Sequence, residues 1–141
     1  MLQINDKITE ILEGVQNSVP VEEWDNFSLT IMKINLFTQM RAFYEANGEI
    51  KSFDPESSGI EIFGEAENLR KMMYELAPEK GAWFSAFFTV QSDGQFHTHF
   101  EYDEKPEFSY EPSKEKYIDD LKHFPREEHL IPQWLKDIIN S

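Results

Sequence analysis

The chain has 141 residues, no cysteine and a formal net charge of −14 at pH 7, from 27 acidic and 13 basic side chains. Such a surface repels phosphate backbones and anionic lipids, so we expect neither nucleic acid nor a membrane as a partner. Without cysteine there is no disulfide framework and no thiolate chemistry. The length predicts one domain, residues 1–141, with a single core.

Two observations favour a cytoplasmic location. No apolar run reaches the roughly 18 residues that a membrane-spanning helix needs. The N-terminus lacks the basic start and apolar middle of a signal peptide.

The first predicted element is an amphipathic helix over residues 2–17. Its apolar side chains recur at spacings of three and four and form one stripe: Ile4, Ile8, Ile11, Leu12 and Val15. Pro20 stops any continuation. The stripe predicts that this helix packs on an apolar face, which we expect to be a sheet.

Alternating side chains predict three strands, at residues 27–35, 39–46 and 49–53. The pair Asn47-Gly48 indicates a tight hairpin between the last two. A helix over residues 36–45 is the alternative interpretation. Residues 60–63 are expected to form a short strand or part of a loop. A helical stripe of Leu69, Met72, Met73 and Leu76 predicts a helix over residues 66–76.

Residues 82–103 predict an antiparallel hairpin with its turn at Asp93-Gly94. In the first strand, Trp83, Ser85, Phe87 and Thr89 are expected on the face opposite to Phe84, Ala86 and Phe88. Both faces are then largely apolar, which favours a central position in the sheet. In the second strand His97, His99 and Glu101 share a polar face, opposite to Phe96, Thr98 and Phe100.

The C-terminal segment predicts two helices, at residues 114–123 and from about Pro132 onward. The order is therefore helix, three strands, helix, two strands and two helices. This order predicts an α+β fold, with a mostly antiparallel sheet of about five strands packed by the N-terminal, middle and C-terminal helices.

The residues His97, His99 and Glu101 are the strongest candidates for chemistry. Two imidazoles and a carboxylate on one strand face have the donor types of a metal site. A further ligand would have to come from His123 or His129, and an exposed polar face explains the pattern as well. We therefore expect no metal, no other cofactor and no catalytic residue, and keep a metal-dependent enzyme or metal-binding domain as the alternative.

The densest feature is an acidic stretch with interleaved aromatic side chains. The residues predicted to bind a partner there are Glu101, Tyr102, Asp103, Glu104, Glu107, Tyr110 and Glu111. Aromatic rings supply buried area and carboxylates accept bidentate hydrogen bonds from arginine, so this stretch suits a basic protein partner. The competing interpretation is a solvated acidic face with its aromatics in the core.

Two segments also resemble a known family. The runs WFSAFFTVQSDGQF (residues 83–96) with FEYD (residues 100–103), and DDLKHFPREEHLIPQWL (residues 119–135), resemble the bacterial YezG-like family. The resemblance implies an immunity protein, or antitoxin, that binds and neutralises a cognate secreted polymorphic toxin. Such toxins include LXG-type proteins whose C-terminal domains are often nucleases. It also implies no catalysis. The further alternative is an interaction module unrelated to toxins, in one version a homodimer through a sheet edge. The sequence leaves the oligomeric state open.

Overall fold

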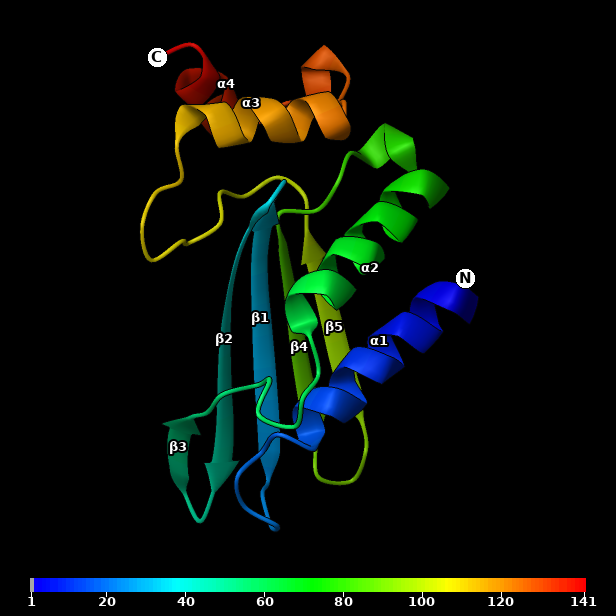
Figure 1. Ribbon diagram of the computed structural model, residues 1–141, viewed down its shortest axis with the longest axis vertical. Coiled ribbons are helices and arrows are strands. Elements are labelled where there is room, and N and C mark those ends of the chain that lie inside the picture. The colour runs from blue at the N-terminus through cyan, green and yellow to red at the C-terminus, as the bar shows by residue number, and fades with distance from the viewer. Residues whose placement is uncertain (1) are drawn as a thin grey trace.

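The computed structural model describes residues 2–141 and has the expected order of elements. Figure 1 shows its helices and strands. The helices are α1 (Leu2–Gln16), α2 (Ile62–Leu76), α3 (Lys114–His123) and α4 (Gln133–Ile139), with short 3-10 turns η1 (Pro78–Lys80) and η2 (Glu128–Leu130). The strands are β1 (Asn26–Ile34), β2 (Phe37–Ala46), β3 (Glu49–Ser52), β4 (Ser85–Gln91) and β5 (Phe96–Glu101).

The five strands form one antiparallel sheet in the order β3-β2-β1-β4-β5. This confirms the predicted α+β class and the strand interpretation of residues 39–46. The strand after residue 82, β4, is an interior strand as expected, because it pairs with β1 on one side and with β5 on the other. The central strand of the five is β1.

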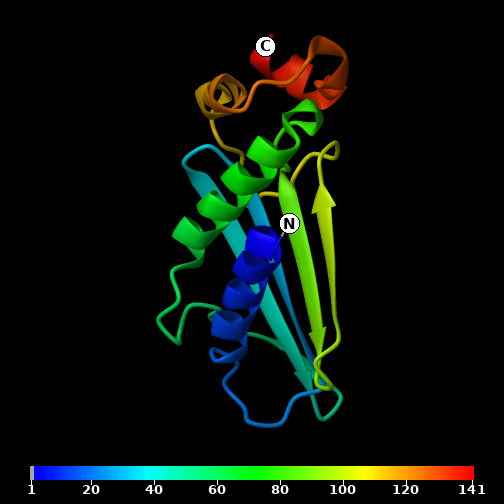
Figure 2. The same ribbon diagram turned by 90° about the vertical axis from the view of Figure 1, so that its right-hand side faces the viewer.

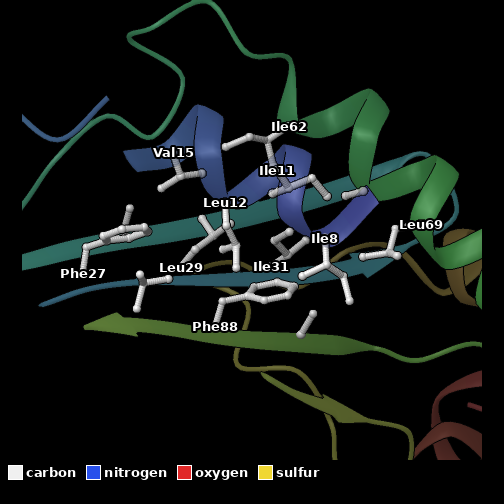
Figure 3. Close-up of a cluster of buried hydrophobic side chains, with 14 of the residues drawn as sticks. Ile8, Ile11, Leu12, Val15, Phe27, Leu29, Ile31, Ile62, Leu69 and Phe88 are labelled. Carbon is white, nitrogen blue, oxygen red and sulfur yellow. The ribbon is translucent and has the colours of Figure 1, made fainter. Parts of the chain in front are cut away.

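Helices α1 and α2 cover one face of the sheet (Figures 1 and 2). The stripe of α1 meets the inward side chains of β1 and β4, as Figure 3 shows for Ile11, Leu29 and Phe88. Burying one such side chain fully contributes about 1.5–3 kcal/mol. The alternation of β1 and the spacing in α1 are therefore both explained by this core. We call this side of the sheet the core face and the opposite side the open face.

Helix α2 starts four residues earlier than predicted, so residues 62 and 63 are helical and only residues 60 and 61 of the strand or loop expected at 60–63 are loop. Ile62 is fully buried in the core, and its backbone N–H donates to the Glu56 carboxylate at 2.8 Å. Glu56 thus satisfies one of the free donors at the helix start.

The close packing of α1 on the segment before α2 requires a glycine at position 14. A Cβ on Gly14 would collide with the side chain of Ile60.

A β-bulge changes the alternation before β4. Ser85 is the register partner of Glu101, yet the N–H of Phe84 also donates to the Glu101 carbonyl, at 2.8 Å. Two residues therefore face one, and the strand's faces are exchanged beyond this point. Trp83 lies in the main core and not on the face of Ser85 and Phe87, where the alternation had placed it.

The prediction of a single core was wrong, because a second core lies at the end of the sheet beneath α3 and α4. Ile34, Phe84, Tyr117 and Leu135 are its buried members. Figure 1 shows the two helices lying across this end. Within residues 2–141, no helix is both long enough and apolar enough to cross a membrane.

Candidate interaction surface

The open face of the sheet carries the candidate site. Figure 2 shows α1 and α2 on the other side, and α3 and α4 beyond the end of the strands. Phe43 of β2 and Phe87 of β4 point away from the core here, and each keeps 41% of its surface exposed. Exposed rings of this size on an open sheet are typical of contact surfaces.

The register explains why this face is hollowed. Thr30 in the central strand lies between Arg41 of β2 and Phe87 of β4. One pair along, Ser28 lies between Phe43 and Thr89. At these two positions the central strand contributes short polar side chains, and the side chains beside them are larger. Side chains of unequal length on one pleated face leave a trough along the short ones.

The resulting hollow has a volume of about 500 Å³. Its floor and walls come from the sheet, and its rim comes from the end of β5 and the segment that follows it. The lining residues are Thr30, Met32, Arg41, Phe43, Ser85, Phe87, Glu101, Glu104, Lys105 and Glu107.

Residues 102–113 connect β5 to α3 and are held against the far edge of the hollow. The Arg41 guanidinium donates to the Glu107 carbonyl at 2.6 Å, and the Ser109 N–H donates to the Gln39 side chain at 2.7 Å. Phe108 packs edge to face on Phe37, with ring centroids 5.1 Å apart. These contacts with β2 fix the segment across the open face, so its carboxylates stand beside the exposed rings.

Glu104 and Glu107 are the carboxylates most available to a partner. Both side chains are exposed and both line the hollow. Within residues 2–141 neither carboxylate is engaged in a hydrogen bond or an ion pair, while the backbone carbonyl of Glu107 is held by Arg41. They therefore present negative charge from a fixed backbone.

Glu101 has a local structural role. Its carboxylate lies 3.1 Å from His99 Nε2 and accepts from the N–H groups of Asp103 and Glu104, at 3.2 and 3.3 Å. The hydrogen bond with His99, followed by the one from Asp103, lowers the pKa of this carboxyl. Glu101 therefore stays ionised and closes the turn that follows β5.

Glu111 is also engaged within the chain. Its carboxylate accepts from Lys105 Nζ at 2.8 Å and from the Tyr117 hydroxyl. Burial opposes ionisation, but the hydrogen bonds from Lys105 and Tyr117 lower the pKa of Glu111 overall. Burial, together with Glu111, raises the pKa of the Tyr117 hydroxyl, which therefore remains a donor.

The remaining predicted partner-binding residues lie in different surroundings. Tyr102 packs against the main core, and burial raises the pKa of its hydroxyl. Asp103 is exposed, while its carbonyl accepts from Trp134 Nε1 at 2.7 Å. Tyr110 is 68% exposed and stacks edge to face on Phe37. Of the seven residues, the structure thus brings Glu101, Glu104 and Glu107 together at the hollow.

The alternative metal ligands stand in a row on β5. His99 contacts Glu101 and stacks on Phe87, while His97 lies opposite Thr89. Across residues 2–141, no three His, Cys, Asp or Glu side chains are gathered closely enough to hold a metal ion. His123 contacts Asn35, and His129 lies near Glu127.

The residues that the sheet adds to this surface were not predicted from the sequence. Arg41, Phe43 and Phe87 are far from residues 101–111 in the sequence and meet them only through the strand order. The one available signal was Phe87, because it alternates with the core residues Ala86 and Phe88.

No family model matches this chain, and the search of curated proteins found no match either.

Proposed function

We propose that this chain is an immunity protein that binds a cognate secreted toxin, in one form a nuclease, and neutralises it by covering its basic surface. The observation that carries the proposal is the open sheet face, where Phe43 and Phe87 stand exposed beside the carboxylates of Glu104 and Glu107. The two rings supply apolar area, and the carboxylates select lysine and arginine on the partner.

The net charge of −14 supports the same partner. Long-range attraction to a basic protein speeds encounter and disfavours acidic partners. A nuclease must hold phosphate in a basic cleft, so an acidic protein is well suited to occupy it. The resemblance to the YezG-like family supports a role without catalysis, in the cytoplasm where an incoming toxin would act.

The test uses the protein encoded by the adjacent gene as the probe. Co-expression should restore growth, and the two purified proteins should elute as one complex. The variant Glu104→Lys/Glu107→Lys should then associate about tenfold or more slowly at low salt, because charges at a rim act mainly on the on-rate. Phe87→Ala should instead speed dissociation, because it removes a contact anchor.

The matched control reverses two exposed carboxylates elsewhere, Glu75→Lys/Glu79→Lys on α2 and η1. This control changes the net charge by the same amount as Glu104→Lys/Glu107→Lys. A larger loss of association rate in the Glu104/Glu107 variant would therefore show that the contact lies at the hollow. Equal effects in both variants would show that the open face is not the contact. Absence of any complex with the wild-type chain, together with no growth rescue, would overturn the proposed function.

A further inference from the structure

Strand β5 forms one margin of the sheet, with α1 and α2 packed on one side of it (Figures 1 and 2). The N–H of Gln91 donates to the carbonyl of Gln95 at 2.8 Å. Because paired residues in an antiparallel ladder alternate, residues 97, 99 and 101 also direct their backbone groups toward β4. The N–H and C=O groups of Phe96, Thr98 and Phe100 therefore point outward from the sheet.

The two edge strands of the sheet, β3 and β5, differ in how well they are protected against pairing with a strand of another molecule. Strand β3 has four residues, of which Glu49 and Lys51 are charged. A short, charged edge is a common protection against strand addition. Strand β5 has six residues and contains no proline, glycine or lysine. Four of its six residues, Phe96 to His99, are exposed. The β5 edge is thus the one open to a further strand.

The sequence of β5 specifies which strand fits. Phe96-His97-Thr98-His99-Phe100 reads the same in both directions. Two antiparallel copies with a two-fold axis at Thr98 would place Phe96 opposite Phe100 and His97 opposite His99. The rings then meet on the core face and the imidazoles on the open face. Glu101 meets the neutral Gln95, so within the paired strands no two carboxylates lie directly opposite.

We propose that the chain forms a two-fold homodimer through antiparallel pairing of β5 with β5 of a second copy. Thr98 lies on the axis, and Phe96, Thr98 and Phe100 contribute about six hydrogen bonds across it. The symmetry is that of an isologous interface, in which one surface meets itself. The open faces of both copies lie on the same side of a continuous sheet, which leaves both hollows free. The inference does not depend on the toxin.

The net charge of each copy opposes this dimer, so dimerisation should depend on salt concentration in a characteristic way. Two copies of −14 repel at long range, and salt shortens that repulsion to about 8 Å at 0.15 M. The dissociation constant should therefore fall as NaCl is added, in contrast to a complex with a basic partner, which salt weakens.

Sedimentation equilibrium at micromolar concentrations tests the proposal. The wild-type chain should approach twice its monomer mass of 16.7 kDa as concentration rises. Thr98→Pro removes the backbone N–H of residue 98, which points away from β4, so no hydrogen bond to β4 is lost. Proline is tolerated where the N–H of an edge strand faces solvent. This variant should raise the dissociation constant about tenfold or more, equivalent to about 1.4 kcal/mol.

Ser52→Pro is the matched control on the other edge. The N–H of Phe53 donates to the Ala42 carbonyl, so Ser52 directs its own N–H outward from β3. This variant should dimerise as the wild type does. Circular dichroism checks that both proline variants are folded.

Cysteine substitution gives a readout that does not depend on tolerance of proline. The chain has no cysteine, so Thr98→Cys introduces a single thiol. Opposed residues in a hydrogen-bonded pair have Cα atoms about 5.5 Å apart, within the range of a disulfide. Mild oxidation should link Thr98→Cys into a dimer and leave Ser52→Cys monomeric. A wild-type monomer at all concentrations, or equal cross-linking of the two cysteine variants, would overturn the proposal.

Discussion

At the scale of single residues, the turn between β1 and β2 places a leucine in an unfavourable left-handed backbone conformation. Ile34 pairs with Phe37, so only Asn35 and Leu36 form the turn. Leu36 has a φ of 58° and its side chain is 66% exposed. A left-handed conformation costs a residue with a Cβ roughly 1–2 kcal/mol. The neighbouring hairpin avoids this cost, because Asn47 and Gly48 occupy its positive-φ positions.

Leu36→Gly should therefore raise the free energy of unfolding by roughly 0.5–1 kcal/mol, after the larger chain entropy of unfolded glycine is subtracted. Urea unfolding followed by circular dichroism measures the change. Gly48→Ala is the opposite case, because it puts a Cβ at a φ of 76° in open space, and it should lower stability. A decrease for Leu36→Gly would mean that the exposed leucine side chain makes a stabilising contact.

At the scale of elements, one buried ion pair joins α2 to α3. The Arg70 guanidinium donates to both carboxylate oxygens of Asp120, at 2.6 and 3.0 Å, and to the Trp83 carbonyl at 2.6 Å. Asp120 also accepts from the Asn35 N–H at 2.7 Å. The pair thus connects the two helices, the segment just before β4 and the β1–β2 turn.

Removing either partner leaves the other charge buried. Arg70→Met and Asp120→Leu should each cost about 3–5 kcal/mol of unfolding free energy, since an unpaired buried charge is strongly destabilising. The double variant should cost clearly less than the sum, because no charge remains buried alone. Urea unfolding of the four proteins of this cycle gives the coupling energy. A purely additive cycle would show that the two side chains act independently.

The same elements show what the sequence could predict. Periodicity identified α1, β1 and β2, because each of them packs one side on the core. The turns at Asn47-Gly48 and Asp93-Gly94 indicated the two hairpins, although β3 and most of β5 are exposed. Periodicity placed Trp83 on the wrong face of the strand. The β-bulge at Phe84 reverses the alternation, and no signal in the sequence marks it. The candidate surface was predicted only along residues 101–111. Its other half, Arg41, Phe43 and Phe87, depends on the strand order, and many orders suit the same pattern of strands.

At the scale of the whole molecule, the charges fall into two groups. Several basic side chains are used internally: Lys7 pairs with Glu65 and Lys33 with Glu67, and Arg126 donates to the carbonyls of Ala82 and Tyr102. Burial lowers the pKa of Lys33. Exposed carboxylates such as Glu104 and Glu107 therefore outnumber the cations that could offset them at the surface. The net charge of −14 acts as a repulsion within the folded chain.

Salt should therefore stabilise this protein. Raising NaCl shortens the Debye length from about 30 Å at 0.01 M to about 8 Å at 0.15 M, which screens repulsion between distant surface charges. The buried pair of Arg70 and Asp120 is screened much less, so the net change in the free energy of unfolding at pH 7 should be an increase. Urea unfolding of Thr98→Pro at each salt concentration separates this effect from dimer formation. Glu22→Gln/Glu23→Gln removes two negative charges at exposed positions and should reduce the response to salt. A fall in stability with added salt would mean that surface ion pairs such as Lys105 with Glu111 outweigh the repulsion.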